Sequence, residues 1–123
     1  MVVLDTSAVI EILRGSKKGA QIEDAIGHEK VFITAFTVHE IMMGVKETEI
    51  YKTQGFLSSV EILVFDFSSA MASSQIERGL IKKGKKIEES DIFIAGICLA
   101  NNLGLITLDN DFIEIKELDV KVF

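Results

Sequence analysis

The sequence contains no proline, a single cysteine, and no apolar run that approaches the roughly 20 residues of a membrane-spanning helix. One cysteine, Cys98, excludes an intrachain disulfide and fits a reducing compartment. The first residues, Met-Val-Val-Leu-Asp, have neither the basic segment nor the cleavage site of a secretory signal. We therefore expect a cytoplasmic protein that does not enter a membrane.

Several common catalytic motifs are also missing. No Gly-rich phosphate loop of the form GxxxxGK[ST] occurs, which argues against a phosphotransferase built on such a loop. No Ser-His-Asp or Cys-His arrangement is visible, because His28 falls at a solvated helix end and His39 in the helix around Glu40. Cys98 lies in an apolar run, where a buried structural thiol is expected rather than a nucleophile.

The length and composition predict one folded domain. The chain has 123 residues, of which 48% are hydrophobic, enough for a single core and too many for a disordered chain. No linker, repeat or low-complexity stretch divides it. We therefore treat residues 1–123 as a single domain.

Short apolar runs alternate with longer amphipathic segments along the whole chain. Strands are predicted at 2–4, 31–34, 61–65, 105–107 and 120–123. Helices are predicted at 7–13, 17–28, 37–47, 50–59, 68–83, 90–102 and 110–115. This alternation predicts an α/β fold, in which helices cover both faces of a parallel sheet.

Four acidic residues lie just after predicted strands or in the first turns of predicted helices. Asp5 follows the first strand, Asp109 follows the strand at 105–107, and Glu40 and Asp91 fall in the first turns of helices. In an α/β sheet these positions meet at the carboxyl edge, where ligands bind. Clustered carboxylates repel one another unless a cation lies between them, and hard divalent cations prefer oxygen ligands.

Helix capping is an alternative explanation for these acids. Glu40 could complete a capping box with Thr37, and Asp91 could stabilise a helix that begins at Ser90. Asp109 or Asp111 could cap the segment that follows. Asp5 is harder to explain in this way, because a carboxylate leaving a buried strand is costly unless it is paired.

Taken together, the motifs resemble the PIN-domain family, and within it the VapC-type toxins. The resemblance rests on Leu-Asp-Thr-Ser at 4–7, Thr-Val-His-Glu at 37–40, Asp-Ile-Phe-Ile-Ala at 91–95 and Thr-Leu-Asp-Asn-Asp-Phe at 107–112. It covers essentially the whole chain. It implies a three-layer α/β/α domain with a central, mainly parallel sheet, and a metal-dependent ribonuclease that is commonly a homodimer and is inhibited by an antitoxin.

The resemblance also assigns roles to individual residues. Asp5, Glu40, Asp91 and Asp109 match the acidic quartet, which would be both catalytic and metal-binding. Ser7 matches the small hydroxyl residue after the first acid, where it can hydrogen-bond to a ligand or to Asp5. Thr107 matches the hydroxyl residue before the last acid, and both hydroxyls are expected to contact the substrate. Asp111 is a rival for the fourth position, although Asp109 lies nearer the strand end.

Such a site fits Mg²⁺ or Mn²⁺, which activates water and stabilises charge on the phosphoryl oxygens. We expect Asp5 and Asp91 to bind the ion directly, and Glu40 and Asp109 to bind waters or a second ion. The remaining alternatives are a PIN-domain nuclease of housekeeping RNA processing and a non-enzymatic binding module.

The charge pattern bears on the partners. The net charge of −6 argues against nucleic acid, but residues 78–86 hold five cations and no anion, and residues 14–18 form a smaller basic cluster. Either cluster could be a solvated helix end. Beside an acidic site, we expect the helix with Arg78 and Lys82 to contact the RNA backbone.

The segment Ile41–Val45 is too continuously apolar for one helix face, so it is either a covered core helix or a groove for an antitoxin or second subunit.

Overall fold

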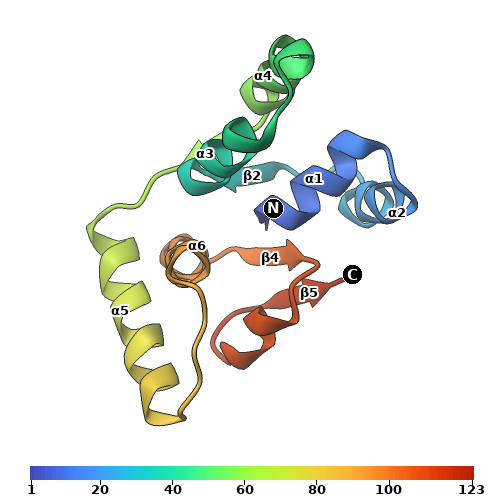
Figure 1. Cartoon of the computed structure of the whole chain (residues 1–123). Helices are drawn as coiled ribbons and strands as arrows, with labels where there is room; N and C mark the ends of the chain where they lie inside the picture. Colours follow the sequence, from blue (N-terminus) through green and yellow to red (C-terminus); the bar gives the residue numbers. More distant parts are fainter.

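The computed structural model describes all residues from 1 to 123, arranged as five strands, six α-helices and two short 3-10 helices (Figure 1). The strands are β1 (Val2–Leu4), β2 (Val31–Thr34), β3 (Glu61–Leu63), β4 (Gly104–Thr107) and β5 (Val120–Val122). The α-helices are α1 (Thr6–Arg14), α2 (Lys17–Ile26), α3 (Ala35–Gly44), α4 (Ile50–Ser59), α5 (Phe67–Lys82) and α6 (Glu89–Ala100). The 3-10 helices are η1 (Glu47–Glu49) and η2 (Asn110–Glu114). None of the helices is both long and apolar enough to span a bilayer.

All five strands are parallel and lie in the order β3-β2-β1-β4-β5. The chain builds the sheet outward from β1 to β3, then crosses to the other side of β1 to add β4 and β5. The strand order therefore reverses between β1 and β4, and α/β sheets bind ligands at the carboxyl end of such a switch point. The predicted α/β class is confirmed.

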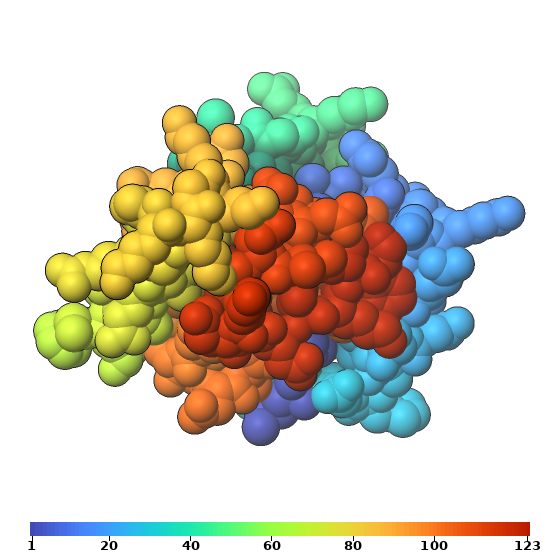
Figure 2. All heavy atoms as spheres, turned by 90° about the horizontal axis from the view of Figure 1, so that it is seen from below, coloured from blue at the N-terminus to red at the C-terminus, as the bar shows by residue number.

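Neighbouring residues on each strand serve opposite faces of the sheet. Val3 and Leu105 pack with residues of α5 and α6, whereas Leu4 and Ile106 pack with residues of α1, α2 and α4. The sheet is thus the middle of three layers, and helices cover it on both sides. Figure 2 shows the C-terminal segment with β4, η2 and β5 between α5 on one side and the N-terminal helices on the other.

Helix α6 packs against α5 at unusually close range. A Cβ added at Gly96 of α6 would lie 2.7 Å from Cβ of Ser73 and 2.8 Å from the backbone oxygen of Ser69, both on α5. Contacts this short do not occur between real side chains, so only glycine allows the two helices to approach in this way. The small residues at this crossing therefore fix the position of α6, which carries Asp91.

Most predicted boundaries lie within about two residues of the observed ones, and two differences concern helix starts. Helix α3 begins directly after β2, because the hydroxyl of Thr34 accepts a hydrogen bond from the backbone N–H of Thr37 at 3.3 Å. Thr37 is therefore inside the helix and buried, and the predicted start at Thr37 is wrong. Helix α6 begins at Glu89 rather than Ser90.

Candidate active site

The carboxylate of Asp5 is buried at the carboxyl end of β1, with only 4% of the residue exposed. Its Oδ1 accepts hydrogen bonds from the Ser7 hydroxyl at 2.7 Å and from the backbone N–H of Ala8 at 3.0 Å. Its Oδ2 accepts a short hydrogen bond from the hydroxyl of Thr107 at the end of β4. Burial raises the pKa of Asp5 even though these three donors oppose the increase.

Two hydroxyl groups connect the ends of β1 and β4. Besides donating to Asp5, the Ser7 hydroxyl accepts from the backbone N–H of Leu108 at 3.0 Å. Similarly, the Thr107 hydroxyl accepts from the backbone N–H of Asp109 at 2.9 Å. Each hydroxyl therefore links the first acid to the loop that carries the last one. The hydrogen bond from Ser7 to Asp5 is one of the two contacts predicted for Ser7, whereas the hydrogen bond from Thr107 to Asp5 was not predicted.

Glu40 projects from α3 and is held by a residue that the sequence did not single out. The Thr6 hydroxyl donates to Glu40 Oε1 at 2.7 Å, and it lies 3.1 Å from the hydroxyl of Thr37. Thr6 directly follows Asp5, so one turn of chain positions two acids that are far apart in the sequence. The only sequence signal for Thr6 was its place inside the Leu-Asp-Thr-Ser motif.

Asp91 lies in the first turn of α6, where the charges of the three other acids act on its carboxyl group. Its pKa is raised to about 7, first by burial and then by the charges of Asp109, Asp5 and Glu40, with Glu88 adding a further contribution. The three other members of the predicted quartet all act on this carboxyl. The structure therefore brings the four predicted acids to one edge of the sheet.

Helix capping explains only part of this arrangement. Asp5 does cap α1, and Asp109 caps η2 by accepting from the backbone N–H of Asp111 at 2.9 Å. Glu40 forms no capping box, because the cap of α3 is Thr34, and Asp91 caps nothing because the cap position of α6 is Glu88. Capping therefore leaves Glu40 without an explanation, and for Asp91 it leaves only the favourable placement of an acid in the first turn of a helix.

Between the two rivals for the fourth position, the geometry favours Asp109. Its charge acts on both Asp5 and Asp91, whereas Asp111 is exposed and contributes to neither pKa. Asp111 lies one step further from the sheet, in the turn that Asp109 caps.

The donor chemistry of the site suits a hard divalent cation. Its donors are carboxylate and hydroxyl oxygens, the ligand type that Mg²⁺ prefers, and Mg²⁺ typically keeps several waters and few protein ligands. In the structure, no group of three or more acidic, histidine or cysteine side chains lies close enough to hold an ion directly. The carboxylate oxygens point instead to hydroxyl and backbone donors, as expected for like charges that would otherwise repel.

The other predicted residues lie outside this cluster. Arg78 and Lys82 lie on the exposed side of α5 and take part in none of the four ion pairs. Their contact with RNA stays a prediction. Cys98 is fully buried in α6, and burial raises the pKa of its thiol to about 12, which confirms a structural role. His28 and His39 are both exposed.

Comparison with known proteins identifies the family of this chain. A sequence model of the PIN domain matches residues 2–118. The chain belongs to the PIN-domain family. This confirms the resemblance drawn from the acidic motifs, which was expected to cover essentially the whole chain.

Several relatives of this PIN domain carry VapC names. The ribonuclease VapC3 of Methanocaldococcus jannaschii is 37% identical over 97 residues, which cover 77% of this chain and 95% of the relative. The tRNA(fMet)-specific endonuclease VapC of Salmonella typhimurium is 25% identical over 121 residues, covering 94% and 90% of the two chains. A crystal structure of VapBC-5 from Mycobacterium tuberculosis, a member of the VapBC family of toxin–antitoxin systems, matches with a TM-score of 0.77 and 25% identity, covering 99% of this chain and 96% of that one.

Proposed function

We propose that this PIN domain is a Mg²⁺- or Mn²⁺-dependent ribonuclease, the toxin of a type II toxin–antitoxin pair. The observation that carries the chemistry is the convergence of Asp5, Glu40, Asp91 and Asp109 at the switch point of the sheet. The VapC names of its relatives support RNA as the substrate and a toxin as the biological role. An RNA substrate and an unpaired, buried cysteine both fit the cytoplasm.

In this proposal the four acids divide into two pairs. Asp5 and Asp91 hold the ion, which when bound acidifies water and stabilises negative charge on the phosphoryl oxygens. Glu40 and Asp109 orient the attacking water. Ser7 and Thr107 keep Asp5 in place, since each donates a hydrogen bond to one of its two oxygens. Asp91 must lose its proton for the ion to bind, so affinity should rise with pH around its raised pKa of about 7.

The direct test compares the wild type with Asp5→Asn on a mixed RNA substrate in Mg²⁺, Mn²⁺ or EDTA. We expect cleavage only with metal, leaving 5′-phosphate and 3′-hydroxyl ends, and a loss of more than about 100-fold in the variant. Asp24→Asn, which changes an exposed aspartate on α2, is the matched control and should cleave normally. Cleavage by a folded Asp5→Asn protein, or cleavage in EDTA, would refute the metal mechanism.

The antitoxin is expected to bind in a cleft of about 610 Å³ between α1, α3 and α4. Ile10, Leu13, Ile41 and Val45 give it an apolar lining, and Glu40 places it next to the acids. Part of the apolar segment of α3 is core and part lines this cleft, which supports the groove alternative. Met42 packs against the core, so Val45→Glu tests the groove better than a change at Met42.

The expected result is that Val45→Glu arrests growth on expression but is no longer neutralised by the antitoxin encoded beside it. Growth arrest by the wild type would also separate a toxin from a housekeeping nuclease. Normal neutralisation of Val45→Glu would place the antitoxin elsewhere.

A homodimer would use a different surface. Val64, Phe67 and Met71 follow β3 and begin α5, and they are 64%, 79% and 50% exposed. Large apolar side chains exposed together mark interaction surfaces in soluble proteins. We therefore place the proposed dimer contact at this end of α5.

A further inference from the structure

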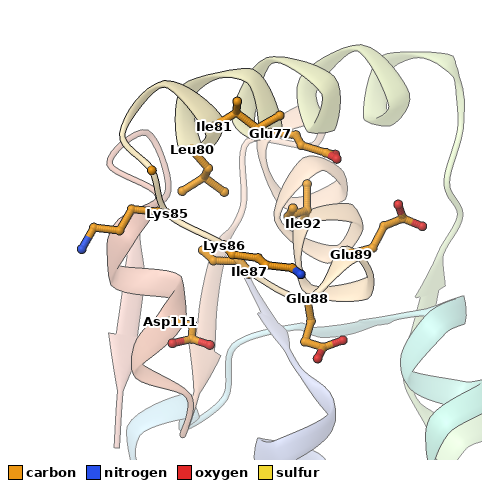
Figure 3. Close-up of a pocket in the computed structure, with 11 residues that line it drawn as sticks. Glu77, Leu80, Ile81, Lys85, Lys86, Ile87, Glu88, Glu89, Ile92 and Asp111 are labelled. Atoms are coloured by element: carbon orange, nitrogen blue, oxygen red, sulfur yellow. The ribbon is translucent and has the colours of Figure 1, made fainter.

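A cleft of about 850 Å³ lies between the C-terminal end of α5, the connection from α5 to α6, and the first turn of α6, with η2 on its far side (Figure 3). Its volume is within the range of about 300–1,000 Å³ that is typical of small-ligand sites. Leu80, Ile87 and Ile92 give it a buried apolar floor.

Two residues on the rim of this cleft interact with members of the acidic site. Glu88, on its rim, is close enough to Asp91 for its charge to act on that carboxyl. On the other rim, the backbone N–H of Asp111 donates to Asp109 Oδ1 at 2.9 Å. A chain that passes over the acidic edge between α6 and η2 therefore enters the cleft directly.

The two lysines that line the cleft differ in what they bind. Lys85 forms an ion pair with Glu114 of η2 at 3.8 Å. Lys86 takes part in none of the four ion pairs, although carboxylates line the same cleft. Figure 3 shows Lys86 extended across the cleft toward the first turn of α6, while Lys85 points the other way. Lys86 is therefore a cation without a partner, directed into a cleft beside the acids.

We infer that this cleft binds the RNA nucleotide adjoining the scissile phosphate, with Lys86 contacting its phosphate and the apolar floor its ribose and base. The inference rests on the ribonuclease function proposed above. Lysine binds phosphate as a mobile point charge, which suits a contact that positions the backbone without reading the sequence. Within the basic segment at residues 78–86, Lys86 is thus the unpaired cation that reaches the cleft.

The remaining polar lining predicts a base preference. Apart from the lysines, every polar side chain that lines the cleft is a carboxylate: Glu77, Glu88, Glu89 and Asp111. Ionised carboxylates only accept hydrogen bonds, and the exocyclic amino groups of cytosine, adenine and guanine are the matching donors. Uracil lacks an exocyclic amino group and offers only its single N3–H as a donor, and no aromatic side chain lines the cleft to hold it by stacking. We expect uridine to bind most weakly at this position.

The first test measures binding of a labelled, mixed-sequence single-stranded RNA in EDTA across a series of salt concentrations. Lys86→Ala should raise Kd about tenfold and reduce the slope of log Kd against log salt by about 0.7, the value for one phosphate contact on a single strand. Lys86→Arg should restore the slope. A purely structural role would leave the slope unchanged.

Two lysines provide matched controls for the loss of charge. Lys85→Ala alters the same cleft at a lysine that is already paired, and Lys30→Ala alters a lysine paired with Glu61 at 2.6 Å next to the start of β2. Both should keep the wild-type slope. An unchanged slope in Lys86→Ala, or an equal decrease in Lys30→Ala, would overturn the inference.

The second test titrates isoleucine-methyl-labelled protein with the four nucleoside 5′-monophosphates. The methyl signals of Ile87 and Ile92 should shift with AMP, CMP and GMP and least with UMP, and the shifts should weaken in Lys86→Ala. Equal shifts for all four, or none at these two residues, would overturn the base preference or the cleft. Neither test needs catalysis, so a wild type that cleaves RNA while Lys86 proves irrelevant would refute only this inference, whereas failure to cleave would refute the proposed function.

Discussion

Removing the carboxylate of Asp91 should make the metal-free protein more stable at alkaline pH, although it should also abolish activity. Burial, followed by the charges of Asp109, Asp5 and Glu40, raises the pKa of Asp91 from its ordinary 3.8 to about 7. Ionising this group therefore costs the folded protein free energy that the unfolded chain does not spend. Asp91→Asn keeps the shape of the side chain and eliminates that cost.

The sign of the effect follows from the two pKa values. Well below pH 3.8 the carboxyl is protonated in both the folded and the unfolded chain, and it does not affect the free energy of unfolding. As the pH rises toward 7, the unfolded chain ionises first, so the wild type loses stability. Above the folded pKa the loss is complete and constant.

The magnitude can be bounded from the same values. Each pH unit between the two pKa values corresponds to about 1.4 kcal/mol, so the full difference corresponds to about 4 kcal/mol. Asp91 keeps contact with solvent, which screens its charge, and we therefore expect a gain of about 1–2 kcal/mol at pH 8. For a domain of this size such a gain raises Tm by roughly 4–8 °C.

The assay is urea unfolding of wild type and Asp91→Asn in EDTA at pH 8 and pH 4.5. The gain should be largest at pH 8 and much smaller at pH 4.5, and the exposed Asp24→Asn should show neither. Adding Mg²⁺ at pH 8 should stabilise the wild type more than the variant, because only the wild type keeps both proposed ligands. An Asp91→Asn protein that is no more stable than wild type at pH 8, or equally stabilised at both pH values, would refute the electrostatic argument.

Three further substitutions test other parts of the structure. Thr107→Val removes a buried hydroxyl that donates a hydrogen bond to a carboxylate and accepts one from a backbone N–H. The free energy of unfolding, measured by urea titration, should fall by about 1–3 kcal/mol, and Thr107→Ser should largely restore it. Thr6→Val releases Glu40 and should lower kcat for RNA cleavage about tenfold while melting near the wild-type temperature; an unchanged kcat would show that the 2.7 Å contact is incidental. Phe67→Glu should convert the proposed dimer to a monomer in sedimentation experiments, whereas Tyr51→Glu, at an equally exposed aromatic on α4, should not.

Sequence patterns predicted the sheet and its edge well because they depend on local alternation. The short apolar runs became strands, and the acids that follow them met at the switch point, as parallel topology requires. That Asp109 lies nearer than Asp111 to the strand end, and so to the other acids, could also be predicted from the sequence. These features depend on residues that are close together in the sequence, so they can be predicted without knowledge of tertiary contacts.

The sequence analysis failed in two situations. Either two neighbouring residues were equally good candidates for one role, or the role depended on a contact between residues far apart in the sequence. Thr34 and Thr37 are both followed three residues later by a possible cap partner, and only the packing of α3 directly after β2 decides that Thr34 begins the helix. Thr6 was missed because its partner Glu40 is 34 positions away. Lys86 could not be separated from its basic neighbours, because only the structure shows which of them faces a cleft.

The close crossing of α5 and α6 has a consequence for how such a site can change over evolutionary time. Gly96 and the two serines opposite it are in contact with no candidate ligand, yet they set the depth at which α6 rests on α5. Any larger residue there would push the helix outward and carry Asp91 with it. The spacing of the four acids therefore depends on a helix crossing that lies away from the active site. A single methyl group added there would lower the activity of the enzyme while leaving its active-site residues unchanged.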